Sequence, residues 1–206
     1  NIRFIKPASF PISRCKILNR KGCQMIYGER IRLRAPEREF IPLFFDWIND
    51  PEVRHGLTIF KPMSIAGEEI WFEKMLKLPE HEQPFTIEVK DENGKYLPIG
   101  NIGLFDIDWI ARKSEFGIMI GRKDHWDQGL GTDTIKLFLE YCFNTLNLNC
   151  VRLSVYSYNT RAQHVYENIG FVHEGVLRQS IFRFGEYHDE IKMSVLRSEW
   201  LSGKQK

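Results

Sequence analysis

Apolar residues alternate with polar ones in several short stretches of the chain, and in others they recur at helical spacing. Ile31 and Leu33 alternate with arginines and predict a half-buried strand. The apolar residues of 40–48 and of 65–78 recur every three or four positions and predict two helices. In the second helix the positions expected to face inward are Ile70, Trp71, Met75 and Leu78.

The rest of the chain continues this mixture of strands and helices. Strands are predicted over 85–89, 99–107, 114–120 and 151–156, and helices after the glycines at 129–131 and over 160–169. Turn residues at 92–95 and 184–187 predict two β-hairpins, the second of which ends the fold. This order predicts an α+β sandwich, with a mixed central sheet and helices on both faces.

Composition fits one domain. A chain of 206 residues is long enough for one complete core and short for two. No apolar run approaches the ~20 residues that a membrane span needs, so no membrane partner is expected. The four cysteines have no metal-binding spacing, and Cys142 and Cys150 are expected to be buried free thiols, as in a reducing, cytoplasmic setting.

Charge is uneven along the chain. Residues 1–24 carry six basic side chains and no acidic one, whereas 25–206 carry 23 basic and 27 acidic residues. A folded part without a basic surplus argues against nucleic acid as a partner. Residues 1–24 hold no 7–15-residue apolar region, which argues against a secretory signal. We interpret them as an extension outside the fold, of targeting, upstream or tag-like origin, and 25–206 as a single domain.

The most informative stretch is 113–132, KSEFGIMIGRKDHWDQGLGT. An apolar strand leads into a charged loop, and Gly129 and Gly131 then open an amphipathic helix. Glycines let the backbone bend, and the free N–H groups of Leu130, Gly131, Thr132 and Asp133 can then bind a phosphate. Taken alone, this pattern also suits an ordinary turn between a strand and a helix.

A second motif follows about thirty residues later, at 156–171, YSYNTRAQHVYENIGF. Together the two motifs resemble the acetyl-CoA-binding core of the GNAT N-acetyltransferase superfamily, and the similarity extends from about Met25 to Trp200. The matching positions are Gly129, Gly131, Asn159, Ala162, Tyr166, Gly170 and Phe171. The resemblance implies a three-layer sandwich with a splayed pair of parallel strands, and acetyl-CoA as co-substrate without any metal.

Contacts to acetyl-CoA are implied by the same resemblance. The implied residues are Ile118, Met119, Ile120, Trp126, Asp127, Gln128, Gly129, Leu130, Gly131, Thr132, Asn159 and Tyr166. In the family the strand that holds 118–120 is bulged and splayed, so that its backbone pairs with pantetheine and polarises the thioester carbonyl. Asn159 suits a helix N-cap equally well.

Two side chains are candidates for the chemistry. Tyr166 matches the family's tyrosine beside the sulfur and is the expected acid for the leaving thiolate, because a phenol's pKa near 10 lies within about two units of a thiol's. Packing on an amphipathic helix is its alternative role. Glu115 matches an acidic residue that assists deprotonation of the amine, often through water, and it also suits an exposed strand position.

The phosphate loop departs from the common family pattern. Trp126 stands three residues before Gly129, where relatives often carry Arg or Gln. Charge to offset the phosphates must then come from elsewhere, and Arg122 or Lys123 are the candidates.

The amine acceptor is predicted from a comparison within the family. Spermidine enzymes usually carry an acidic cluster after the first helix, whereas 51–64 here contains one carboxylate, Glu52, beside three basic residues. A small amine or a peptide N-terminus is therefore expected first and a polyamine second, with direct transfer in a ternary complex.

Two further readings stay open. The chain suits a non-catalytic sensor or partner-binding module for acetyl-CoA, although a pure binder would not need Tyr166. A homodimer is one form of association that the resemblance implies, although no residue in the sequence shows an interface.

Overall fold

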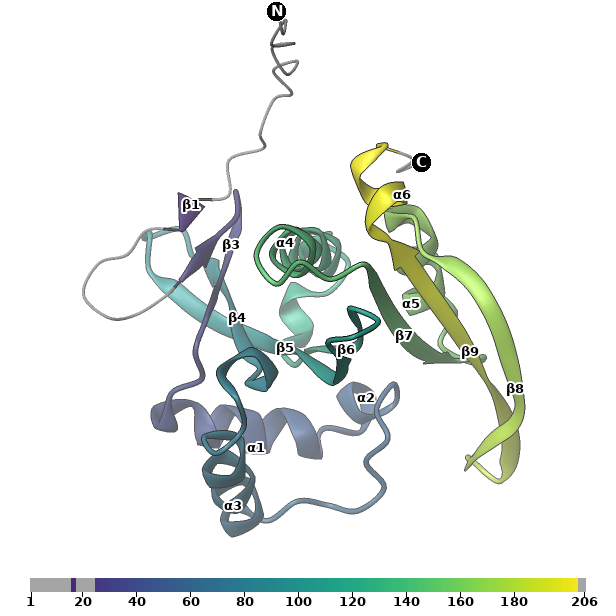
Figure 1. Cartoon of the computed structure of the whole chain (residues 1–206). Coiled ribbons are helices and arrows are strands. Elements are labelled where there is room, and N and C mark those ends of the chain that lie inside the picture. Colours follow the sequence, from purple (N-terminus) through teal and green to yellow (C-terminus); the bar gives the residue numbers. More distant parts are fainter. Residues whose placement is uncertain (1–15, 18–24, 204–206) are drawn as a thin grey trace, which may run out of the picture.

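The computed structural model describes residues 16–17 and 25–203, and these form one layered domain (Figure 1). The strands are β1 (Lys16–Ile17), β2 (Ile26–Tyr27), β3 (Ile31–Arg34), β4 (Phe85–Lys90), β5 (Tyr96–Asp108), β6 (Lys113–Ile120), β7 (Cys150–Tyr156), β8 (Val172–Arg183) and β9 (Glu186–Leu196). The α-helices are α1 (Ile41–Asn49), α2 (Pro51–Arg54), α3 (Ile65–Met75), α4 (Leu130–Asn144), α5 (Thr160–Ile169) and α6 (Arg197–Leu201). Short 3-10 helices are η1 (Arg38–Phe40), η2 (Glu80–Glu82) and η3 (Lys123–His125).

The strands form one mixed sheet. Among the described residues the order across it is β1-β2-β3-β4-β5-β6-β7-β9-β8, with β6 and β7 the parallel pair. Helices α1 and α3 cover one face, and α4 and α5 cover the other (Figure 1). The predicted α+β sandwich with helices on both faces is confirmed.

Two of the three hydrophobic clusters among the described residues hold the helical layers to the sheet. The larger lies between the sheet and α4, where Phe138 and Phe143 are almost fully buried. The smaller lies under α1, where Phe44 and Trp47 are buried and contact Trp71 and Met119 at its edge. Buried aromatic side chains of this size contribute about 1.5–3 kcal/mol each, so both helical layers are firmly fixed to the sheet.

Helix α3 differs from its prediction in end point and orientation. It ends at Met75, and Ile70 is 56% exposed and Leu78 42% exposed, so two of the four expected inward positions are wrong. Phe72 is buried instead, together with Met75 and with Ile41 of α1. Apolar residues occur on more than one side of this helix, and its packing against α1 decides which side is buried.

The hairpin turns and the thiols follow the sequence more closely. Gly94 adopts a positive φ in the β4–β5 turn, as do Phe184 and Gly185 in the β8–β9 turn. Cys142 and Cys150 are buried free thiols, as predicted.

The segment 1–24 is described only at Lys16–Ile17, which pairs antiparallel with Ile26–Tyr27. The other residues of the predicted extension lie outside the described part, so its separation from the domain stays a prediction. In the described part no helix has both the length and the apolar character to cross a bilayer.

Candidate active site

The site forms where the parallel strands separate. β6 and β7 pair only from Lys113–Glu115 to Cys150–Arg152. β7 continues to pair with β9 along its whole length, so it follows β9 away from β6. In the described residues, the edge of β6 from Phe116 to Ile120 therefore has no strand beside it on the β7 side. The predicted splay is confirmed.

The bulge expected in this strand is absent. Glu115–Ile120 pair in unbroken register with Gly100–Phe105 of β5, and the register shifts only beyond Phe105. The splay thus arises from the divergence of β7, and β6 stays regular. Its free backbone groups are the kind of donors and acceptors that an extended ligand can pair with.

The loop before α4 is bent at Gly129, as the glycine pattern predicts, but the second bend is at Asp127 and not at Gly131. Asp127 and Gly129 have positive φ angles of 58° and 76°, whereas Gly131 lies within the helix. A Cβ at Gly131 would meet nothing within 4 Å, so this glycine leaves space open instead of allowing a bend.

The start of α4 offers three donors. The N–H groups of Leu130, Gly131 and Thr132 have no acceptor in the described residues, and all three residues line a cavity. The N–H of Asp133 donates to the carbonyl of Gly129 at 3.0 Å, so the expectation that it is free is wrong. A helix N-terminus with free N–H groups is suited to a phosphate.

Gln128 is held away from the cavity. Its side-chain amide donates to the carbonyl of Asp124 at 2.8 Å, and its own carbonyl accepts from Arg30 at 3.0 Å. Arg30 also pairs with Asp133 at 2.6 Å. These bonds fix the loop from outside, so Gln128 supports the loop and does not line the cavity that was expected to include it.

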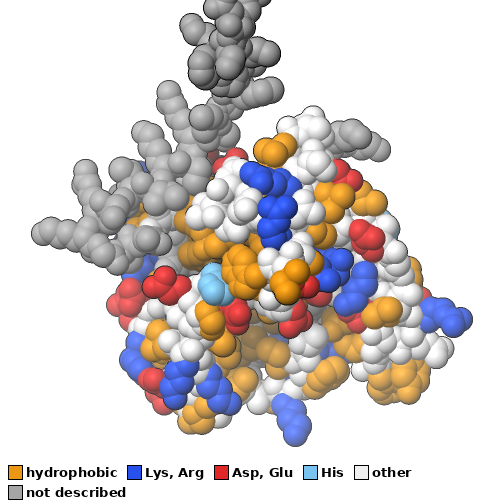
Figure 2. Space-filling view, in the orientation of Figure 1, with side chains coloured by type: hydrophobic (Ala, Val, Ile, Leu, Met, Phe, Trp, Pro, Cys, Tyr) orange, Lys and Arg blue, Asp and Glu red, His pale blue; other side chains and the backbone are white. Residues whose placement is uncertain are grey.

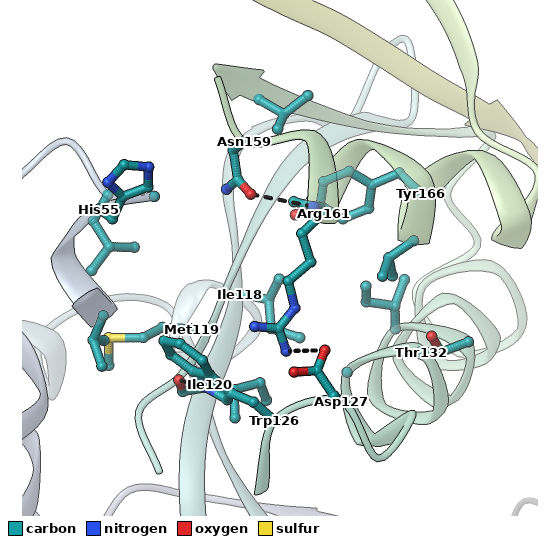
Figure 3. A pocket seen from close by; sticks show the side chains of 18 of the residues that line it. His55, Ile118, Met119, Ile120, Trp126, Asp127, Thr132, Asn159, Arg161 and Tyr166 are labelled. Carbon is teal, nitrogen blue, oxygen red and sulfur yellow. Dashed lines mark hydrogen bonds and ion pairs between the residues drawn. The ribbon is translucent and has the colours of Figure 1, made fainter. Parts of the chain in front are cut away.

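Trp126 occupies the place where a polar residue is usual. Its indole N–H donates to the carbonyl of Ile120 at 2.8 Å, which satisfies one free group on the β6 edge. The guanidinium of Arg161, from α5, lies 4.9 Å from the indole ring centre and pairs with Asp127 at 3.1 Å (Figure 3).

The expected sources of positive charge lie elsewhere. Arg122 pairs with Asp124 at 2.9 Å, and Lys123 pairs with Asp50 at 2.9 Å and Glu52 at 2.7 Å. Neither of these basic residues lines the cavity. Arg30 contacts the loop from outside, so among the described residues Arg161 is the arginine that lines the cavity beside the phosphate loop.

These elements enclose a cavity of about 490 Å³. The predicted residues that line it are Ile118, Met119, Ile120, Trp126, Asp127, Gly129, Leu130, Gly131, Thr132, Asn159 and Tyr166. Asn159 also caps α5, since its side chain accepts from the Ala162 N–H at 3.2 Å, so the cap role is confirmed and the side chain still borders the cavity. Figure 3 shows labelled residues of β6, the loop and α5 around this space.

A second cavity of about 910 Å³ lies between the sheet and the α1–α3 layer. Figure 2 shows a recess between that helical layer and the β8–β9 hairpin, with hydrophobic side chains in its depth. Residues that line both cavities are Gly56, Leu57, Ile118, Met119, Ser154 and Tyr166. The two spaces thus share a wall at the open edge of β6.

Tyr166 stands at this shared wall. Its ring packs against Phe116 and Phe171, with ring centres 6.1 and 5.8 Å apart. Its hydroxyl has no hydrogen-bond partner among residues 16–17 and 25–203, and burial raises its pKa to about 12. The phenol is therefore protonated at neutral pH and free to donate to a group between the cavities. The pKa of Tyr166 therefore differs from that of a thiol by more than the two units expected from the sequence, because burial raises the pKa of the phenol.

Glu115 lies in the second cavity and belongs to a polar network. Ser154 donates to its carboxylate at 2.5 Å and accepts from Lys192 at 2.5 Å. Lys192 also pairs with Glu190 at 2.7 Å. Ser154 borders both cavities, so Glu115 is connected to the shared wall through one hydroxyl.

Sequence reasoning missed Arg161, Ser154 and the α2-loop residues His55 and Leu57 that line the first cavity. Arg161 lies inside the second motif, and its presence there was the available signal. The sequence carried no signal for Ser154 and Leu57, because their positions at the cavity follow from the splay of the strands and from the approach of α2. No group of three or more potential metal ligands occurs in the described part of the chain.

A cleft suited to a phosphate-bearing chain against a β edge, next to a second cavity, is an arrangement that an acyltransferase can use. Comparison with known proteins agrees. Residues 30–172 match the family described as acetyltransferase (GNAT) domain. The chain belongs to the GNAT family, and it is an N-acetyltransferase with acetyl-CoA as its acetyl donor.

Several relatives carry this activity in their names. The N-acetyltransferase p20 of Bacillus licheniformis is 30% identical over 179 residues, covering 86% of this chain and 98% of the relative. The spermidine N(1)-acetyltransferase of Vibrio cholerae is 36% identical over 121 residues, covering 59% of this chain and 67% of the relative. A crystal structure of the Vibrio cholerae spermidine N-acetyltransferase with CoA and spermine superimposes with a TM-score of 0.75 at 31% identity, covering 84% and 98% of the two chains.

Proposed function

We propose that the protein transfers the acetyl group directly from acetyl-CoA to a primary amine of a small cationic amine of the diamine or polyamine class. The observation that carries this proposal is the wall shared by two cavities, which lets both substrates bind at once with Tyr166 between them. Direct transfer needs such a ternary complex, because the amine must attack the thioester while both substrates are bound. No acetyl group is then stored on the protein.

The charge of the second cavity supports a cationic acceptor. Five carboxylates line it, from Glu68, Glu82, Asp106, Glu115 and Glu190, against two lysines, Lys74 and Lys192. Opposite charges attract strongly where water is partly excluded. The ranking of acceptors made from the sequence, which placed a polyamine second, considered only the carboxylates of residues 51–64. The carboxylates come instead from α3, η2, β5, β6 and β9.

Glu68 is the carboxylate whose environment most favours a cation. It is 6% exposed and its side chain has no ion-pair or hydrogen-bond partner in the described residues. Burial raises its pKa, which measures the cost of its unpaired charge. An ammonium group beside it would remove that cost, so Glu68 supports an acceptor with a second positive charge.

The chemistry follows from the groups at the shared wall. Acetyl-CoA supplies the acetyl group as a thioester. The amine loses a proton to Glu115, directly or through water, and its lone pair forms the new C–N bond. Backbone N–H groups of β6 stabilise the negative carbonyl oxygen. As the C–S bond breaks, the electron pair leaves on sulfur, and Tyr166 donates the proton that yields free CoA thiol. The proton that the new amide nitrogen loses then restores the phenol of Tyr166.

A panel of acceptors tests the proposal. We expect kcat/KM for CoA thiol release to be highest with spermidine, spermine or a short diamine. Monoamines of similar length are the matched controls, because they lack only the second charge. A preference for peptides with free Ala, Ser or Met N-termini would contradict the proposed acceptor while leaving acetyl transfer intact. Acetyl-CoA binding without thiol release from any amine would favour the sensor reading.

Association and location are further parts of the proposal. The β8–β9 hairpin exposes Val176, Leu177, Phe182, Phe184 and Tyr187, which supports its use as a contact in a homodimer. Analytical ultracentrifugation of a Phe182→Ser variant tests this, since a monomer is expected. The buried free thiols support a cytoplasmic setting, which fractionation of the native protein would check.

A further inference from the structure

The first cavity is crossed by one ion pair. Arg161 extends from the first turn of α5 to the phosphate loop, where its guanidinium contacts the carboxylate of Asp127 (Figure 3). Both residues line the cavity, and the guanidinium also lies over the ring of Trp126. The pair thus joins the two segments between which acetyl-CoA must enter.

We propose that Arg161 exchanges partners on acetyl-CoA binding. It leaves Asp127 and binds a phosphate of the cofactor, so Asp127 acts as an internal competitor for the phosphate-binding cation. This inference rests on acetyl-CoA as the donor and not on the proposed amine, so it stands or falls separately from the acceptor.

The existing ion pair is weak enough to be replaced. The side chains of Arg161 and Asp127 are 50% and 82% exposed, and exposed ion pairs contribute little to stability. The 3′-phosphate of CoA carries more charge than a carboxylate, and the pyrophosphate places two negative groups side by side; either can accept two parallel hydrogen bonds from a guanidinium, whereas Asp127 makes one contact at 3.1 Å. The stacking on Trp126 restricts the guanidinium to the cavity side, so little freedom remains to be lost on binding.

The departure of the loop from the family pattern makes this cation necessary. Trp126 brings no charge, and its N–H is already bonded to Ile120. Arg122 and Lys123 are held by acidic neighbours outside the cavity. Among the described residues that line the first cavity, Arg161 is the one side chain with a permanent positive charge.

Asp127 has a second property that suits this role. Its positive φ of 58° is a conformation that Asp and Asn tolerate better than other non-glycine residues. Asp127→Asn therefore removes the charge while keeping the backbone and the size of the side chain, and it is the clean variant for the test.

The test is calorimetric titration of acetyl-CoA into the full chain and its variants. Arg161→Gln is expected to weaken binding about tenfold, the loss typical of one charge-assisted hydrogen bond. Asp127→Asn is expected to tighten binding by roughly two- to fivefold, because an exposed competitor is removed. Arg161→Lys keeps the charge without the paired geometry and should fall between wild type and Arg161→Gln.

The opposite signs distinguish this proposal from a structural role. If the ion pair merely holds the loop in place, both substitutions break the same contact and both weaken binding to the same extent, which would overturn the proposal. Arg122→Gln is the matched control, because Arg122 lies in the segment before α4 and pairs with Asp124 outside the cavity, and it should change the Kd by less than about twofold. Thermal unfolding shows that each variant is folded.

A second titration with dephospho-CoA identifies the phosphate. If Arg161→Gln weakens CoA but not dephospho-CoA, the partner is the 3′-phosphate. If it weakens both equally, the partner is the pyrophosphate. Equal affinity of wild type and Arg161→Gln for both compounds would overturn the proposal.

Discussion

Replacing Tyr166 by Phe removes one hydroxyl at the wall between the two cavities. The ring keeps its packing against Phe116 and Phe171, and no hydrogen bond to a described residue is lost. The free energy of unfolding should therefore change by less than about 0.5 kcal/mol, as for substitutions that remove no partnered group. The variant isolates the chemical role of the hydroxyl.

The size of the effect follows from the pKa. Burial raises the pKa of Tyr166 to about 12, whereas a thiol has an ordinary value near 8.5. A gap of roughly 3.5 units makes complete proton transfer to the thiolate uphill by about 5 kcal/mol, so the phenol acts chiefly by donating a hydrogen bond to the sulfur as negative charge gathers there, and the proton lost by the amide nitrogen completes the transfer. General acids contribute 10²- to 10⁴-fold, and the raised pKa places this one near the lower end, at about 10² in kcat.

The assay is steady-state release of CoA thiol at saturating amine, combined with calorimetric binding of acetyl-CoA. We expect kcat to fall about 10²-fold and the Kd to stay within about twofold. Tyr141→Phe is the matched control, since burial also raises the pKa of that phenol but Tyr141 lines neither cavity. Full turnover by the Tyr166→Phe variant would refute the acid role, and a parallel loss of binding would assign the hydroxyl to cofactor recognition.

Three further substitutions test other parts of the site. Glu68→Gln should raise the KM of a diamine about tenfold, because one charge-assisted contact is lost. The same substitution should stabilise the fold at neutral pH. Because the pKa of Glu68 is raised in the folded state, its ionisation lowers the stability of the wild type as pH rises through that raised value. Urea unfolding of the wild type and the Glu68→Gln variant at pH 4 and pH 8 checks the sign of this difference. A wild type that is more stable than the variant at pH 8 would contradict it. Glu115→Gln should lower kcat/KM about 10²-fold at pH 7 and less at pH 10, where the amine is already neutral in part, so an unchanged defect across a pH–rate profile would argue against a base. Gly131→Leu should weaken acetyl-CoA binding more than tenfold by filling open space, while helix propensity raises stability by about 0.5–1 kcal/mol; calorimetry showing unchanged affinity would exclude the proposed path of the cofactor.

The fold and the donor site could be predicted because their signals are local. Gly129 and the strand before it reveal a phosphate loop within twenty residues, and the Asn159–Phe171 motif adds the second wall. The bend at Gly129 follows from the first motif, whereas the splay was expected only from the family resemblance that the two motifs carry. The physical role assigned to Gly131 from the sequence was wrong. A sequence does not show whether a glycine is needed for a positive φ angle or for the space that a missing side chain leaves open.

The acceptor cavity could not be predicted in the same way. Its carboxylates are separated by up to about 120 positions, from Glu68 to Glu190, and only the closure of the sheet and α3 brings them together. Arg161 was passed over because Arg122 and Lys123 are nearer to Gly129 in sequence, although each is neutralised by an acidic neighbour. Distance along the chain is a poor guide wherever separate elements meet at one cavity.

The most direct test of direct transfer is mass spectrometry of a reaction with acetyl-CoA, with and without spermidine. With spermidine we expect acetylated amine and free CoA in equal amounts, and protein of unchanged mass. Without the amine we expect neither thiol release nor modified protein. Acetylated protein that forms with acetyl-CoA alone and then passes its acetyl group to spermidine would show a covalent intermediate, and it would contradict the two-cavity account.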